Sequence, residues 1–261
     1  MFVLKRDFLP EDLALECKAN GIDASIAVQS SQSEEETLFL LELAENNPQI
    51  AGVVGWVDLA SSQTCERLKL FSRYEKLRGF RHIAQAEPDD GFLVQPDFMR
   101  GISCLREFSF TYDILIYPKQ LPAAIDLVSK FPEQRFVVDH LAKPEIKSRD
   151  SKLWAAHIRR IAKSPNIYCK LSGLVTEADW RNWKAEDFWP YLDVVFEAFG
   201  PDRLMFGSDW PVCLLAASYT QVKQIIEDYL DDYTSAQRQN IFGGNAIRFY
   251  GLKELANGLA A

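Results

Sequence analysis

A carboxylate stands in an unusual place near the C-terminal end of this sequence. The apolar run Leu204-Met205-Phe206 leads through Gly207 and Ser208 to Asp209. Aspartate is unfavourable in strands and costly to bury without a partner, so we expect a specific interaction or function for Asp209 at this position. A carboxylate that faces a partly dehydrated pocket is suited to act as a general base toward water. We therefore take Asp209 as the first candidate catalytic residue, with a turn-capping role as the alternative.

Other residues suited to acid–base chemistry stand in further apolar runs. His140 follows Asp139 in the run from residue 135 to 144, where it is either functional or a structural histidine. Because successive strand residues point to opposite faces, Asp139 is expected to be structural, orienting the His140 ring or bonding the helix layer. Arg81 and His82 are adjacent, so a regular strand can direct only one of them inward.

Two lysines and a group of larger side chains complete the candidates. Lys170 lies in an apolar run, where an unpaired ammonium is costly to bury, so we expect it to meet a carboxylate or a substrate. Lys143 precedes Pro144 in a loop, either at the rim of a pocket or in solvent. Four residues are expected to form pocket walls or hydroxyl contacts, with core filling as the alternative for the aromatic ones: Gln29, Trp56, Tyr117 and Trp210.

Strands and helices in regular alternation must position these residues. Apolar and β-branched runs predict strands at 22–30, 50–59, 77–84, 111–119, 135–144, 166–174 and 203–212, and a helical pattern follows each of them. Ser33 with Glu36, and Thr234 with Gln237, have the spacing of capping boxes at helix starts. Seven repeats with short connections indicate one α/β domain over residues 1–261, built on a parallel sheet.

Two kinds of parallel sheet fit this alternation. A doubly wound sheet would suit a nucleotide, but no G-x-G-x-x-G motif follows the first strand and no P-loop occurs. A (β/α)8 barrel fits better, because polar residues recur at the C-terminal ends of the strands, where such barrels place their active sites. Seven strands are visible where such a barrel has eight, and Met1 is followed at once by what reads as a loop into the first helix.

Composition excludes several classes of partner. The net charge is −8 and 48% of residues are hydrophobic, which is unlike a nucleic-acid-binding or anionic-membrane-binding surface. No apolar run approaches the roughly 18 residues of a spanning helix. The N-terminus has no separate hydrophobic segment or small-residue cleavage site, so export is not expected. The five cysteines lack zinc or redox spacing, which predicts buried free thiols in a cytoplasmic protein. The sequence leaves the oligomeric state open, and a homo-oligomer is compatible with it.

Several motifs resemble those of one enzyme family. GFRH (79–82), DHLAKP (139–144), KLSGL (170–174) and MFGSDWPV (205–212) resemble the amidohydrolase-related lactonases, in particular the sugar-lactone hydrolases of carbohydrate metabolism. The resemblance runs from about Val3 to Gly251 and includes GVVGWVDL, YPKQLPAAI and FGGNAIRFY. It implies a (β/α)8 barrel that opens an aldonolactone, a small sugar-derived substrate, to the aldonic acid.

The resemblance also implies roles for individual residues. It makes Asp209 the general base for the attacking water, or a metal ligand where a metal is bound. It makes His140 the donor to the lactone carbonyl and Arg81 a donor to polar groups of the substrate, with His82 as the alternative inward residue. The remaining candidates are then substrate-binding residues.

One departure from the family pattern concerns the N-terminus and metal binding. Family members begin with a strand bearing an H-x-H motif, and we expect a missing segment of roughly two dozen residues, since the family barrel has eight strands. Catalytic zinc sites usually have three protein ligands, whereas in this chain Asp209 is joined by His140, with His82 as the one further candidate. Either no cofactor is required, or one divalent cation, Zn²⁺ or Mn²⁺, binds at Asp209 and His140. A metal-dependent amidohydrolase or decarboxylase, and a non-catalytic sugar-acid binding protein, remain as alternatives.

Overall fold

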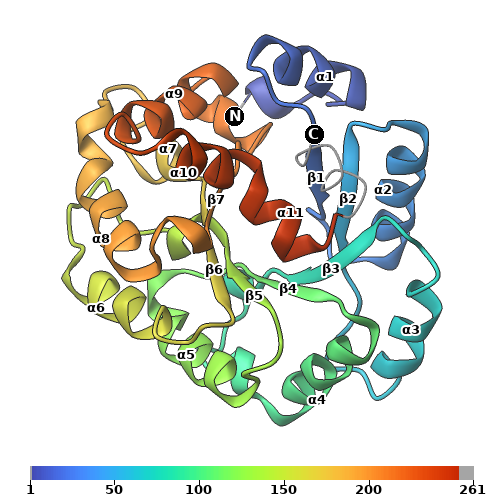
Figure 1. The fold of residues 1–261 in the computed structure, drawn as a ribbon. Coiled ribbons are helices and arrows are strands. Elements are labelled where there is room, and N and C mark those ends of the chain that lie inside the picture. The colour runs from blue at the N-terminus through green and yellow to red at the C-terminus, as the bar shows by residue number, and fades with distance from the viewer. Residues whose placement is uncertain (1, 253–261) are drawn as a thin grey trace.

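The seven predicted strands are confirmed and form one curled parallel sheet in chain order (Figure 1). A computed structural model describes residues 2–252. The strands are shorter than the predicted runs, and most of the polar candidates lie beyond their ends, whereas Arg81, His82 and Lys170 lie within a strand. Their bounds are β1 (Ser25–Val28), β2 (Ile50–Gly55), β3 (Leu77–His82), β4 (Thr111–Ile114), β5 (Phe136–Val138), β6 (Ile167–Leu171) and β7 (Leu204–Phe206).

Helices surround the outer face of the sheet, which gives the predicted barrel-like α/β architecture (Figure 1). The apolar stripe Phe98, Ile102 and Leu105, for example, is fully buried between α4 and the strands. Within residues 2–252 no strand pairs with the outer edge of β1 or of β7. The helices are α1 (Pro10–Ala19), α2 (Glu34–Asn46), α3 (Thr64–Phe71), α4 (Pro96–Leu105), α5 (Leu121–Lys130), α6 (Lys152–Ile161), α7 (Leu174–Glu177), α8 (Trp189–Phe199), α9 (Tyr219–Tyr229), α10 (Ser235–Gln239) and α11 (Asn245–Tyr250).

The last helix, α11, fills the end of the barrel where the strands begin. Arg135, which precedes β5, donates a hydrogen bond to the carbonyl of Phe249, and the rings of Phe249 and Tyr168 lie 5.0 Å apart. Val54, Val137 and Met205 pack with this helix in one buried cluster. The inner space is therefore closed at the N-terminal ends of the strands, and the polar residues gather at their C-terminal ends.

One of the two predicted capping boxes differs from the structure. Ser33 caps α2 by accepting a hydrogen bond from the Glu36 amide, but the Glu36 carboxylate turns to the amides of Ser30 and Ser31 and does not complete a capping box. The second predicted box, Thr234 with Gln237 at α10, is complete.

The prediction of five free thiols is wrong for one pair. Cys65 and Cys104 form a disulfide, with their Cα atoms 5.5 Å apart, whereas Cys17, Cys169 and Cys213 are buried and free. The two paired residues come from α3 and α4, which pack side by side, so the pairing depends on tertiary structure and not on local spacing. No helix within residues 2–252 is long and apolar enough to cross a membrane.

Candidate active site

His140 and Asp209 face each other at the C-terminal ends of β5 and β7. The His140 Nε2 atom lies 3.7 Å from Asp209 Oδ1, and both side chains are mostly buried, with exposed fractions of 11% and 17%. This separation is longer than a direct hydrogen bond, and a water oxygen placed to one side of the gap can contact both groups. The structure thus brings together the two residues that the sequence singled out as catalytic candidates.

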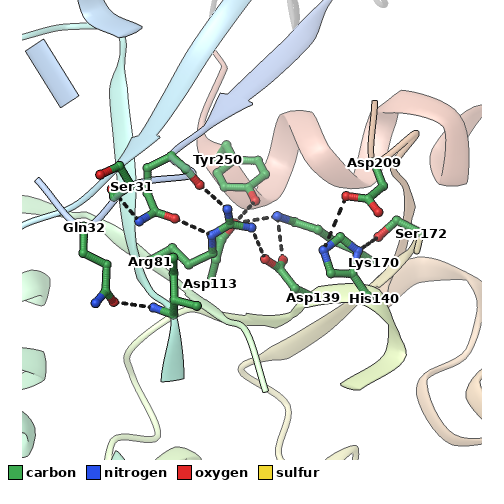
Figure 2. A network of polar contacts seen from close by, with 12 residues as sticks. Ser31, Gln32, Arg81, Asp113, Asp139, His140, Lys170, Ser172, Asp209 and Tyr250 are labelled. Atoms are coloured by element: carbon green, nitrogen blue, oxygen red, sulfur yellow. Dashed lines mark hydrogen bonds and ion pairs between the residues drawn. The ribbon is translucent and has the colours of Figure 1, made fainter. Parts of the chain in front are cut away.

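Ser172 holds the other side of the His140 ring. Its Oγ lies 2.8 Å from His140 Nδ1 (Figure 2), and the residue is buried. Burial lowers the pKa of His140 below its usual value, although the charge of Asp209 acts in the opposite direction. His140 is therefore a neutral imidazole with one nitrogen bonded to Ser172 and the other directed at Asp209. Ser172 was not among the predicted site residues, although it lies inside the KLSGL motif.

A left-handed backbone turn aims His140 at Asp209. The φ angles of His140, Leu141, Ala142 and Lys143 are 53°, 54°, 57° and 49°, and Asp209 itself has φ 54°. Non-glycine residues rarely adopt this conformation, and such outliers cluster at functional sites. His140 thus lies beyond the end of β5. The sequence suggested a position on the strand, which is wrong.

Two neighbours accommodate this turn. Trp154 of α6 donates a hydrogen bond from Nε1 to the carbonyl of Leu141 at 2.7 Å. A Cβ atom on Gly173, which has φ 66°, would lie 2.8 Å from the His140 ring. Gly173 therefore leaves the space that the imidazole occupies beside Ser172.

Asp139 belongs to a buried charge network and not to the His140 ring or the helix layer, which corrects the expectation from strand parity. Because the turn begins after it, Asp139 still points inward. Its Oδ2 accepts a hydrogen bond from Arg81 at 2.9 Å, and its Oδ1 lies 2.7 Å from Lys170 Nζ. Lys170 also lies 2.5 Å from Asp113 Oδ2, which accepts a hydrogen bond from the Tyr250 hydroxyl at 2.8 Å (Figure 2).

This network determines the ionisation states of Asp139 and Lys170 at the base of the site. Burial opposes ionisation of Asp139, but the positive charges of Lys170 and Arg81 prevail and lower its pKa. Burial likewise opposes the charged form of Lys170, whereas Asp113 and Asp139 raise its pKa. Lys170 is thus a protonated lysine between carboxylates, the first of the two arrangements that the sequence allowed. Asp113 and Tyr250 were not among the predicted residues.

Arg81 is the inward residue of the Arg81–His82 pair. Its Nε donates to Gln29 Oε1 at 2.9 Å, and a second guanidinium nitrogen donates to the Gln29 carbonyl. Gln29 is fully buried and its amide nitrogen donates to the Ser31 carbonyl at 3.0 Å. The structure therefore places Gln29 as a support for Arg81 and not as an open pocket wall.

His82 lies beside the site with both ring nitrogens occupied. Trp56 Nε1 lies 3.2 Å from His82 Nδ1, and Glu87 Oε1 lies 2.7 Å from His82 Nε2. Because an indole N–H only donates, Nδ1 must accept, and Nε2 then donates its proton to Glu87. The ring also stacks on Phe92 at 4.7 Å. His82 therefore packs against Phe92 and Phe98 on the helix side of β3, and it has no free nitrogen for proton transfer.

The remaining candidates lie at the rim. Lys143 Nζ lies 5.4 Å from the centre of the Tyr117 ring, which is partly exposed. The same ammonium is 3.9 Å from Oε1 of Glu177, a residue that no sequence signal marked. Trp210 packs edge-on against Phe8 at 5.2 Å, beside Asp209. Phe8 and Glu177 therefore extend the predicted residue set.

The described residues do not provide a closed ligand set for a metal ion. Within residues 2–252, no group of three or more His, Cys, Asp or Glu side chains is arranged to hold a metal. His140 and Asp209 supply two ligand atoms, whereas catalytic zinc sites usually have three protein ligands.

The sequence matches one protein family model and is similar to known enzymes. Residues 2–252 match the family model described as amidohydrolase. The chain is 45% identical to an L-fucono-1,5-lactonase of Burkholderia multivorans, over 98% of this chain and 90% of that protein. It is 36% identical to an L-fucono-1,5-lactonase of Burkholderia ambifaria, over 94% of this chain and 86% of the relative.

A solved structure has the same arrangement of strands and helices. It is a crystal structure of an amidohydrolase from Burkholderia multivorans with bound zinc, 44% identical to this chain, with a TM-score of 0.92. The likeness covers 96% of this chain and 91% of that structure. Because the family model spans the described residues and these relatives share the sequence over most of its length, the chain belongs to the amidohydrolase family.

Proposed function

We propose that this protein hydrolyses a sugar-derived lactone to the corresponding aldonic acid. The observation that carries this proposal is the pair His140 and Asp209, whose facing atoms are 3.7 Å apart in a mostly buried setting. A neutral imidazole and a carboxylate at this spacing suit an attacking water and a carbonyl oxygen. The two lactonases that share 45% and 36% identity with the chain support a sugar lactone as the substrate.

In the proposed reaction, Asp209 removes a proton from water as the water oxygen attacks the lactone carbonyl carbon. The carbonyl oxygen becomes an oxyanion, which accepts a hydrogen bond from His140 Nε2–H. Ser172 supports this role, because a hydroxyl proton donated to Nδ1 leaves the other ring proton on Nε2. When the intermediate collapses, the bond between the carbonyl carbon and the ring oxygen breaks. Protonated Asp209 then gives its proton to that ring oxygen, which becomes a hydroxyl group.

Arg81 assists as a donor to the substrate. Three of its five N–H groups have partners among the described residues, so two are free for a substrate oxygen. The salt bridge to Asp139 and the bonds to Gln29 keep the guanidinium in place. The Trp56 indole and the rim formed by Tyr117, Lys143 and Trp210 would then border the sugar.

A metal-dependent hydrolase or decarboxylase is a second candidate, because the 44% identical structure contains zinc. Metal analysis of the purified protein separates the candidates. Stoichiometric zinc or manganese, together with activity that a chelator abolishes and the metal restores, favours the metal-dependent reaction. Full activity in metal-free protein favours hydrolysis by Asp209 and His140 alone.

A panel of lactones tests the proposed reaction. Acid release from five- and six-membered aldonolactones, measured at constant pH, is expected for at least one sugar configuration. Decarboxylation of aromatic acids, measured as CO₂ release, is expected to be absent. Failure to open any aldonolactone, with the protein folded by circular dichroism, would contradict the proposal.

The proposal also includes the cytoplasmic location, the single domain and the homo-oligomer that the sequence allowed.

A further inference from the structure

A second open pair lies next to the first. Lys143 Nζ and Glu177 Oε1 are 3.9 Å apart, with side-chain exposed fractions of 18% and 23%. This distance exceeds the range of a direct hydrogen bond, although the two groups carry opposite charges. A hydroxyl group between them could donate its proton to the carboxylate and accept a hydrogen bond from the ammonium.

The outer pair is built partly on the segment that carries His140. Lys143 ends the left-handed turn that begins at His140, and its amide donates to the His140 carbonyl at 2.7 Å. Glu177 ends α7, which starts directly after Ser172 and Gly173. Residues 140–143 therefore provide one member of each pair, whereas Asp209 follows β7 and Glu177 ends α7. An atom bound by the outer pair is held in a fixed relation to His140.

The electrostatic setting of Glu177 agrees with a position at the site. Burial raises the pKa of Glu177, and the charge of Asp209 acts in the same direction, whereas Lys143 lowers it. Lys143 in turn lies over the face of the Tyr117 ring, which is a favourable place for an ammonium group. The outer pair is thus partly desolvated and lies within electrostatic reach of the candidate base.

We propose that Lys143 and Glu177 together bind a hydroxyl group of the substrate and so make the enzyme selective for hydroxylated lactones. This inference depends on the proposed lactone hydrolysis and assigns the chemical class of the substrate group at the rim. A carboxylate and an ammonium that share a substrate hydroxyl reject a ring that lacks it, because both charged groups are then left without that partner.

The competing interpretation is that the pair only fastens two loops together. Ion pairs that are partly exposed and lack a direct hydrogen bond contribute little to stability. A fastening role predicts that loss of Glu177 lowers the unfolding temperature or slows the enzyme equally on all lactones. A recognition role predicts an effect that depends on the hydroxyl groups of the substrate.

The experiment compares Glu177→Gln and Glu177→Leu with the wild type on an aldonolactone and on unsubstituted δ-valerolactone. The ratio of kcat/KM for the aldonolactone to kcat/KM for δ-valerolactone is expected to fall about 10-fold to 100-fold, as for loss of a hydrogen bond to a charged group. The change is expected mainly in KM for the aldonolactone. The product aldonate, used as an inhibitor, is expected to bind correspondingly more weakly.

The control is Glu197→Gln, which removes an exposed ion pair with Arg159 between α8 and α6. It is expected to leave the selectivity ratio and the inhibition constant unchanged. If the wild type opens aldonolactones and the Glu177 variants keep both values within twofold, the inference is overturned while the proposed function stands. If the folded wild type opens no lactone at all, the proposed function itself fails.

Discussion

At the scale of single residues, the site is a set of hydrogen bonds in which His140 and Asp209 face each other without a direct bond. His140 Nδ1 is engaged by Ser172, and His140 Nε2 faces Asp209 without touching it. The burial that lowers the pKa of His140 keeps the imidazole neutral, so that it does not form a closed ion pair with Asp209. A free carboxylate and an imidazole N–H are the groups that hydrolysis of an ester needs.

Ser172→Ala tests the control of the His140 ring. Loss of the hydroxyl removes the bond to Nδ1, so the ring is free to rotate and to exchange tautomers. We expect kcat for the aldonolactone to fall about 3-fold to 10-fold, the usual effect of one neutral hydrogen bond, with KM little changed. Ser129→Ala, which removes an exposed hydroxyl on α5, is the control. Equal kcat for Ser172→Ala and the control would show that Ser172 does not position His140.

At the scale of elements, the left-handed turn after β5 links the chemistry to the rim. Four successive residues with positive φ are strained, because this conformation costs about 1–2 kcal/mol per residue for side chains other than glycine. The turn persists because Trp154 bonds the Leu141 carbonyl and Gly173 leaves space for the His140 ring. Strain of this kind, held by its surroundings, is typical of functional sites.

Gly173→Ala and Gly21→Ala form a matched test of this turn. Both glycines have positive φ, 66° and 64°, so either substitution is expected to lower the free energy of unfolding by about 1–2 kcal/mol. Only at Gly173 would the new Cβ meet the His140 ring, whereas nothing lies within 4 Å of it at Gly21. We expect kcat to fall at least about tenfold for Gly173→Ala alone, since small displacements of catalytic groups are costly. Similar activities of the two variants would contradict the role given to Gly173.

The turn also marks where prediction from sequence stops. The strands could be located because each is an apolar run, and Arg81 followed the expected alternation of side chains. The segment DHLAKP contains no glycine or asparagine, so nothing local indicated positive φ at four residues. The parity argument for Asp139 and His140 failed because it assumed that the strand continued. Glu177 lies on a short helix whose place at the rim depends on the packing of the whole site.

At the scale of the whole molecule, one end of the curled sheet is filled and the other is polar. Tyr250 of α11 reaches Asp113, 137 residues earlier in the chain, and completes the network around Lys170. Such long-range pairs are not visible in the sequence, whereas the alternation of strands and helices is. The network closes the base of the site with paired charges, so the unpaired polar groups are those at the C-terminal ends of the strands, where barrel enzymes carry out catalysis.

The central claim is that Asp209 activates the water that opens the lactone, and Asp209→Asn tests it most directly. The amide keeps the shape of the side chain but cannot accept the proton, and general-base catalysis typically contributes about 10²-fold to 10⁴-fold. We expect kcat/KM for the best aldonolactone to fall by at least about 100-fold, with an unchanged unfolding temperature. Asp228→Asn, which changes an exposed carboxylate on α9, is expected to retain full activity. Hydrolysis by Asp209→Asn within a few-fold of the wild type would contradict the mechanism.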